Sequence, residues 1–349
     1  KTLRNTLIGV AVIVLLIVLL SLLPEKNYSS KYEGFDLSSA ATNVSRAKTY
    51  KDYLAAYKGA RSPKDFVEVD VSAFASDSEG VTLEETYQGR SNVIVTQDGS
   101  FVTWTVYVPA EGFYNLEMDY IAVPSRNVNM ERILYINGDI PFTGADLLTF
   151  QRLWRDGSEV RHDNQGNEIR PSQEEFFEWQ TVLFKSDSGY EVDPYQFYFK
   201  KGLNTVSLEG TNEPLAISSL KLAPIQNIGT YEQYLAKQKT KPENFQGSDL
   251  TVRTQGEKSV KRSDPSLFAV YDRSSPVTEP YSVDHTVFNY SGGTSWKTPG
   301  QWIEWNMEVP EDGWYTISFQ ARQFHQRGYL TCRSVYIDGV IPFEDLKSV

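Results

Sequence analysis

The chain has 349 residues, of which 45 are acidic and 34 are basic, and its net charge is −11. This balance argues against nucleic acid as a partner, because phosphate binding needs concentrated Lys and Arg. Cys332 is the only cysteine, so no intramolecular disulfide is possible and stability must come from buried cores. Aromatic residues make up 13% of the chain, which suits β-sandwiches and surfaces that stack on sugar rings.

An apolar segment lies near the start of the chain. No charge occurs from Asn5 to Pro24, and a run of that length can cross a hydrocarbon core about 30 Å thick. Lys1 and Arg4 precede it and Glu25 follows it, so the positive-inside rule places the N-terminus in the cytoplasm. A cleaved secretory signal is the alternative, but the run is longer than the usual apolar region of such signals. We expect residues 1–24 to be a retained anchor and the protein to span the cell membrane once, with the remainder outside.

A polar tether and two short helices are predicted next. Residues 25–48 are polar and rich in Ser and Asn, as linkers are. Thr49 to Ala56 has helical spacing and resembles Thr230 to Ala236 in sequence. We therefore divide this part of the chain into a tether with a short helix over 25–59 and a linker helix over 226–242.

A long segment of the chain occurs twice. Phe101 to Phe142 recurs without a gap as Trp302 to Phe343, at a constant offset of 201 residues. The matching stretches include FVTWTVYVPAEGFYNL with WIEWNMEVPEDGWYTI, and LYINGDIPF with VYIDGVIPF. A constant offset across strands and loops indicates two copies of one folded unit.

Each copy carries the pattern of antiparallel strands. Phe101 to Val108 and Phe113 to Ile121 alternate with a period of two, so we expect them to form a hairpin. Ile133 to Ile136 is a third strand, and the Asn-Gly pair after it favours a type I′ turn. Further strands are expected at 179–185, 195–199, 204–209 and 216–222, which together indicate a β-sandwich.

These patterns predict a mainly β chain with an N-terminal transmembrane helix and tandem sandwich modules. We place module 1 at 60–225 and module 2 at 243–349. The first copy continues for about eighty residues past Phe142, whereas the second stops at Val349. Because a sandwich without half of its strands leaves unpaired edges, we expect module 2 to be truncated within a longer chain.

The candidate ligand site is the polar stretch that follows the third strand of module 1. Sugars are held by aromatic rings against their C–H faces and by charged or amide groups that bind hydroxyl pairs. Residue types suited to this chemistry gather at Trp154, Arg155, Asp163, Asn164, Asn167, Arg170 and Trp179. The alternative is that the stretch is a loop held by its own Asn and Asp turns, with Trp179 in the core.

Other residues are expected to be structural. Trp104 and Tyr114, with their copies Trp305 and Tyr315, should pack in the cores, and Tyr198 should point outward from a strand whose other aromatic residues are buried. Arg126, Arg132 and their copies should pair with acidic neighbours at the surface. Glu68 and Asp70 supply too few oxygen ligands for calcium, so we expect exposed carboxylates and no metal site.

No enzymatic activity and no cofactor are expected. His162, His285 and His325 lack the spacing of a zinc motif, and no nucleophile elbow of the G-x-S-x-G type occurs. A glycosidase needs two carboxylates across a cleft, and nothing in the sequence singles out such a pair.

Several separated motifs carry a family resemblance. They are TYKDYLAAY, GFYNLEMDY, ERILYINGDIPF, RLWRD, DNQGNEIRP and YQFYF, together with the apolar start and the second copy. The repeated unit resembles the galactose-binding-like jelly roll of carbohydrate-binding modules. The whole chain is similar to the front part of large extracellular solute-binding proteins of carbohydrate ABC importers in Gram-positive bacteria.

That resemblance implies capture of oligosaccharides outside the cell for uptake, with ABC permease subunits as partners. Two alternatives stay open: accessory modules of a cell-surface glycoside hydrolase, and a structural spacer or docking module that binds no sugar.

Overall fold

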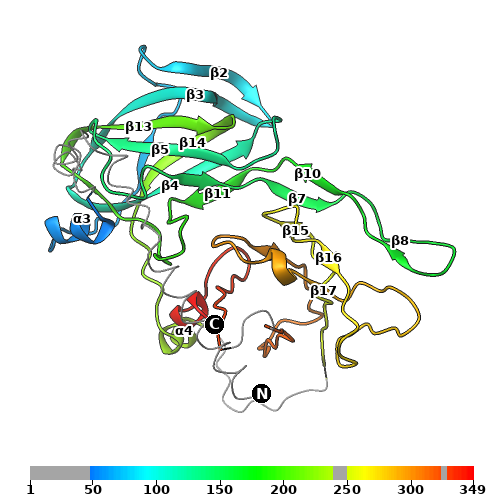
Figure 1. The fold of residues 1–349 in the computed structure, drawn as a ribbon. Helices are drawn as coiled ribbons and strands as arrows, with labels where there is room; N and C mark the ends of the chain where they lie inside the picture. Colours follow the sequence, from blue (N-terminus) through cyan, green and yellow to red (C-terminus); the bar gives the residue numbers. More distant parts are fainter. Residues whose placement is uncertain (1–47, 239–249, 324–327) are drawn as a thin grey trace, which may run out of the picture. The chain divides into compact units, whose positions relative to one another are not determined.

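The computed structural model describes residues 48–238, 250–323 and 328–349. The described chain is mainly β (Figure 1). The predicted membrane segment lies outside these residues, and within them no helix is long and apolar enough to cross a membrane.

One large antiparallel sheet folds over itself to make a β-sandwich from Val67 to Ala223. Its strands are β1 (Val67–Val69), β2 (Glu79–Tyr87), β3 (Arg90–Val108), β4 (Gly112–Ala122), β5 (Met130–Ile136), β6 (Leu148–Phe150), β11 (Gln180–Leu183), β12 (Phe197–Phe199), β13 (Gly202–Asn212) and β14 (Leu215–Ala223). The main path runs β11-β4-β14-β3-β13-β5-β6. The strands expected after residue 179 correspond to β11–β14.

The predicted hairpin between Phe101–Val108 and Phe113–Ile121 is wrong. The second half of β3 pairs with β13, whereas β4 pairs with β14, β11 and β12. Alternation along a strand shows which face is buried but does not identify the neighbouring strand. Gly112, with a φ of 151°, begins β4 beside the carbonyl of Arg61, where a Cβ atom would lie only 2.3 Å from that oxygen.

The type I′ turn after β5 is confirmed. Asn137 and Gly138 have φ values of 54° and 85°, and both are positive as this turn requires. Ile136 and Asp139 exchange backbone hydrogen bonds of 2.9 and 3.2 Å across it.

The core lies between the two layers of the sandwich. Trp104 is completely buried and donates from Nε1 to the carbonyl of Val71 at 3.0 Å. Tyr114 is also buried, so the core assignment of both residues is confirmed. Tyr198 is half-buried and stacks on Tyr57 at 4.0 Å, while the aromatic residues that alternate with it are buried.

Helix α3 (Tyr50–Ala56) packs on this core. Thr49 caps it, and the rings of Tyr50 and Tyr53 lie 4.6 and 5.0 Å from the ring of Phe142. Tyr53 is only 4% exposed. We assigned this helix to the tether, but its contacts attach it to the sandwich.

Helix α4 (Tyr231–Lys237) makes the same contacts with the second copy. Thr230 caps it through a capping box, and Tyr231 and Tyr234 lie 4.9 and 5.5 Å from Phe343. Phe343 is the counterpart of Phe142, so each short helix belongs with the repeat that follows it.

The rest of module 2, described over 250–323 and 328–349 and called the second region below, forms little regular structure. Its elements are β15 (Lys261–Arg262), β16 (Ala269–Val270), β17 (Tyr290–Ser291), β18 (Ile303–Glu304) and the 3₁₀ turns η2 (Gly293–Ser295) and η3 (Glu344–Lys347). Tyr315 is 39% exposed and Trp305 is half-buried, so the prediction that they are core residues is wrong.

An arm of module 1 joins this second region. It consists of β7 (Leu153–Asp156), the small hairpin of β8 (Arg161–His162) and β9 (Glu168–Ile169), and β10 (Gln173–Phe176). Strands β10 and β7 of the arm form a four-stranded sheet with β15 and β18, in the order β10-β7-β15-β18. Figure 1 shows β7 of the arm beside β15.

The two arginines beside β5 have different environments. Arg126 pairs with Asp98 and Glu213, as predicted. Arg132 is buried and donates to three backbone carbonyls and to Thr96, so its predicted surface ion pair is wrong. Burial lowers the pKa of Arg132 to about 10. Arg327 lies outside the described residues, and Arg333 is exposed and donates to two carbonyls.

Candidate functional site

The seven residues predicted to bind ligand do not gather in one place. Six lie on the arm, and Trp179 immediately precedes β11. Trp154 is 8% exposed in β7, where it is paired with Arg262 of β15. Arg155 is exposed, with its guanidinium 5.2 Å from the ring of Phe176.

The tip of the arm is held by its own Asx turn. Asp163 accepts hydrogen bonds from the backbone of Gln165 and Asn167 and from the side chain of Asn167, at 2.8–3.0 Å. The bond from the Asn167 amide is the main cause that holds the pKa of Asp163 below its usual range. Asn164 is exposed in this turn.

The base of the same hairpin contacts the second region. Asn167 accepts from the backbone of Thr286 at 2.8 Å. Arg170 donates to the carbonyl of Ala269 at 3.1 Å and lies 3.9 Å over the ring of Phe268. Asn167 and Arg170 therefore have structural partners outside their own loop.

Trp179 lies on the outer face of the sandwich. Its Nε1 donates to the carbonyl of Gln88 at 2.9 Å, and the Arg90 guanidinium lies 4.5 Å from the centre of its ring. It packs against a small apolar cluster on that face, formed by Val93, Val95, Ile121 and Ala216. Trp179 is half-buried, outside the main core.

Arg90 connects Trp179 to the polar part of the same face. Its Nη1 lies 2.6 Å from Asp119 and 2.6 Å from the hydroxyl of Ser218. Thr181 donates to the other oxygen of Asp119 at 2.5 Å. Asp119 alternates with the core residues Met118 and Tyr120, which places it on the outer face of β4.

A gap in the sheet opens next to Ser218. Strand β14 pairs with β3 as far as Ile217 and with β1 only from Leu220. Between them Ser218 and Ser219 have no register partner on that edge. A bulge opposite Asp119 of β4 inserts the extra residue.

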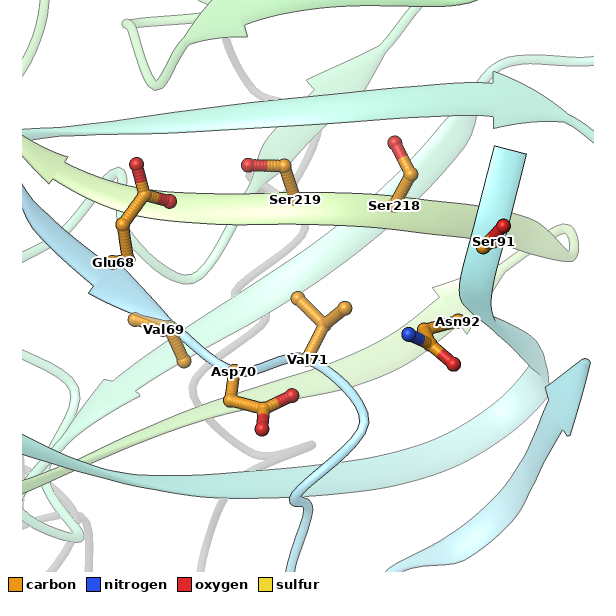
Figure 2. Close-up of a pocket in the computed structure, with 8 residues that line it drawn as sticks. All are labelled: Glu68, Val69, Asp70, Val71, Ser91, Asn92, Ser218 and Ser219. Atoms are coloured by element: carbon orange, nitrogen blue, oxygen red, sulfur yellow. The ribbon is translucent and has the colours of Figure 1, made fainter. Parts of the chain in front are cut away.

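The gap forms a pocket of about 400 Å³ (Figure 2). Figure 2 shows Ser218 and Ser219 projecting from β14, with Asp70 and Asn92 placed below them. Asn92 has a φ of 55°, a left-handed conformation that asparagine tolerates better than most residues. The lining residues are Glu68, Val69, Asp70, Val71, Ser91, Asn92, Ser218 and Ser219. The outer groove, as we name it, comprises this pocket with Arg90, Asp119 and Trp179.

The carboxylates of the outer groove have different partners. Asp70 accepts from the hydroxyl and the backbone of Ser72, and the hydroxyl bond is the main cause that lowers the pKa of Asp70. Lys221 lies 3.7 Å from Glu68 and 4.0 Å from Glu117. Burial raises the pKa of Glu117, and the charge of Lys221 only partly offsets it.

The ammonium group of Lys221 thus lies between the carboxylates of Glu68 and Glu117. Among the described residues no group of three or more His, Cys, Asp or Glu side chains is arranged to hold a metal ion.

No family model and no curated protein matches this chain. Solved structures similar to it include a family 35 carbohydrate binding module from Clostridium thermocellum, which aligns at 16% identity with a TM-score of 0.30. The alignment covers 45% of this chain and 96% of that one.

Two further structures are similar over 45% and 48% of the chain. The CBM6cm-2 module of Cellvibrio mixtus lichenase 5A, in complex with cellotriose, has 13% identity and a TM-score of 0.26; 45% of this chain and 94% of that one are covered. The GH26-CBM35 β-(1,4)-mannanase of Podospora anserina has 13% identity and a TM-score of 0.28, with 48% and 29% covered.

Proposed function

We propose that this chain is a non-catalytic carbohydrate-binding region and that module 1 binds glycans in the outer groove. The observation that carries the proposal is the pocket beside Ser218 and Ser219 of β14, where the sheet has a gap. Hydrogen-bond donors and acceptors line this pocket, and the ring of Trp179 lies on the same face. The bulge and the interrupted pairing set a cluster of polar side chains into a hollow of about 400 Å³.

The chemistry of this groove suits a sugar. Each sugar hydroxyl both donates and accepts, and the pocket offers carboxylates that accept, serine hydroxyls that do both, and the amide of Asn92. Trp179 supplies an apolar surface for C–H groups at the neighbouring position. Arg90 links the two parts through Ser218, so a bound chain of sugars would follow the face from the pocket toward Trp179.

We also propose a more specific role for the chain in the cell. The charge-free segment of residues 5–24 and the motifs that resemble importer solute-binding proteins support a protein anchored in the cell membrane, with the modules outside. In that setting the region captures oligosaccharides for an ABC permease. Accessory modules of a cell-surface glycoside hydrolase would bind glycans in the same way but would have no permease partner.

The test is calorimetric titration of the full chain, kept in a neutral detergent, with neutral and amino oligosaccharides chosen from a glycan array. Asn92→Gly keeps the left-handed backbone and removes the amide, and Trp179→Ala removes the ring. We expect each change to weaken binding about tenfold. Asn164→Gly, at the exposed tip of the arm, is the matched control and should bind as the unchanged protein does.

Two results would reject this assignment. Loss of binding in Asn164→Gly, with Asn92→Gly unaffected, would move the site to the arm. Absence of binding to every glycan by a folded chain would leave the spacer or docking interpretation. Co-purification of permease subunits with the chain from membranes distinguishes the importer from the hydrolase.

A further inference from the structure

The charges of the outer groove do not balance. Four carboxylates face it or border it (Glu68, Asp70, Glu117 and Asp119), against the two cations Arg90 and Lys221. Both cations are already engaged. Arg90 forms an ion pair with Asp119 at 2.6 Å and stacks on Trp179, and Lys221 is shared between Glu68 and Glu117.

Asp70 has no basic partner in the described part of the chain. Its hydrogen bonds come from Ser72, and both reach the same oxygen, Oδ1. The carboxylate lines the pocket with Asn92 and the two serines of the bulge (Figure 2). The hollow therefore presents one carboxylate without a countercharge, together with neutral acceptors.

We propose that the pocket selects a glycan that carries a protonated primary amine, such as a glucosamine unit whose 2-amine is free. This inference rests on the proposed function and names its ligand class. An ammonium group donates three hydrogen bonds and accepts none, and the lining residues Asp70, Asn92 and Ser219 each carry an oxygen that can accept one. A charge-assisted bond to a carboxylate is roughly twice as strong as a neutral one.

The same arrangement disfavours two related ligands. N-acetylation removes the charge and adds a carbonyl oxygen, which would face the Asp70 carboxylate. A uronic acid brings a second negative charge to a groove whose two cations are occupied. Neither Arg90 nor Lys221 can turn to such a ligand without leaving a carboxylate unpaired.

The pH dependence follows from the groups around the pocket. The hydrogen bond from Ser72 keeps Asp70 ionised to a lower pH than an ordinary aspartate, so binding should persist into mildly acidic solution. Binding should be lost at alkaline pH, where the ligand amine is deprotonated. Glu68 of β1 lines the pocket, and Lys221 of β14 links it to Glu117 of β4. Arg90 of β3 and Asp119 of β4 lie beside Ser218 at the other end of the pocket.

The experiment is calorimetry on the full chain in EDTA with a glucosamine trisaccharide, its N-acetylated form and a neutral trisaccharide of the same linkage. We expect the amine form to bind at least about tenfold more tightly than the other two. Asp70→Asn, which keeps the acceptor for Ser72, should remove this preference. Glu85→Gln, an exposed carboxylate on β2, is the matched control and should keep it.

Equal affinity for the amine and acetylated forms would overturn the inference while leaving glycan binding intact. A preference that survives Asp70→Asn, in protein whose near-UV aromatic spectrum is unchanged, would also overturn it. If no trisaccharide binds and no other glycan does, the proposed function itself fails. The comparison of ligands on the unchanged protein decides the question even if the variant does not fold.

Discussion

The two copies of the repeat make the same local contacts. Thr143 donates from its backbone to the carbonyl of Lys48 at 2.8 Å, and its counterpart Glu344 donates to Gly229 at 2.9 Å. The hydroxyls of Tyr114 and Tyr315 donate to the carbonyl four residues earlier at 2.8 and 2.7 Å. The turn after β5 and its copy close with matching backbone bonds of 2.9 and 2.8 Å.

The same positions differ sharply in burial. Val108 and Leu116 are completely buried, whereas Val309 and Ile317 are each 49% exposed. Exposure is also higher in the second copy at the positions of Val106, Tyr114, Met118 and Ile136, which correspond to Met307, Tyr315, Phe319 and Ile337.

The difference separates what a repeat encodes by itself from what needs neighbours. Helix caps, turns and the docking of a helix on Phe142 or Phe343 involve residues close to the repeat and form in both copies. Strands need hydrogen-bonded partners, and those of copy 1 are β11, β13 and β14, which lie after Phe142. Four of the five buried polar atoms without a partner in the described residues belong to the second region.

The largest expected contrast is between the two tryptophans that occupy equivalent positions. Trp104→Ala should lower the free energy of unfolding by about 3–5 kcal/mol, because it empties a completely buried site. Trp305→Ala should cost roughly 1 kcal/mol or less, since its ring is half-buried. Urea denaturation of both variants measures the contrast, and equal losses would contradict the different burial of the two copies.

Disruption of an ion network in module 1 should cause the second-largest loss of stability. Glu213 bonds Arg152 and Arg126 at 2.6 Å, and the side chains of Glu213 and Arg152 are completely buried. Glu213→Gln should cost about 3 kcal/mol, because it leaves the Arg152 charge without this partner.

Acid should have the same effect on the unchanged protein. Burial would raise the pKa of Glu213, but the hydrogen bond from Arg126 and the charge of Arg152 outweigh it and hold that pKa below its usual range. The stabilisation is therefore present at neutral pH and lost as the pH falls through the lowered pKa. The free energy of unfolding should therefore change less with pH in Glu213→Gln than in the unchanged protein. An equal pH dependence in the two proteins would contradict this assignment.

Arg132 and Arg333 provide a smaller contrast. Arg132→Met should cost about 1–3 kcal/mol, because the carbonyls of residues 131, 212 and 213 lose a buried donor. Arg333→Met should change stability by less than about 0.5 kcal/mol, since Arg333 is exposed. Thermal unfolding of the two variants provides the comparison.

Removal of the helix N-caps should have the smallest effect on stability, and the effect should be equal for α3 and α4. Thr49→Ala and Thr230→Ala each remove an N-cap oxygen that accepts a backbone N–H, at a cost of about 1 kcal/mol of local helix stability. Hydrogen exchange at the first turn of α3 and α4 measures it. Unequal changes would show that the helices depend on the strands around them.

Much of the fold of module 1 follows from the sequence alone. Period-two alternation marked the core faces of β3, β4 and β5, and the Asn-Gly pair marked its turn. The sequence did not reveal that β14 lies between β3 and β4 in the sheet, because alternation carries no information on pairing. It also missed the burial of Arg132, because two of its three carbonyl partners, those of Asn212 and Glu213, are distant in the chain.

The candidate site was less accessible to sequence analysis. Trp179 was among the residues predicted to bind ligand, whereas Arg90, Asn92 and the two serines of β14 were not. Ser218 and Ser219 interrupt the apolar alternation of their strand, and that interruption was the available sign of a bulge. The pocket itself depends on where along β14 the pairing with β1 ends and the pairing with β3 begins. No short sequence motif predicts these two positions.

The sheet shared by β7 and β15 also determines how a pulling force would pass along the chain. Tension applied between residues before β7 and residues after β15 would load the contacts of Arg262 with Asp156 and of Arg170 with Phe268 first. Helix α4, which lies between β14 and β15 in the chain, would carry no load until those contacts broke. Stretching a single molecule should therefore break these contacts before any strand of the sandwich unfolds. The chain should lengthen in one step when they break.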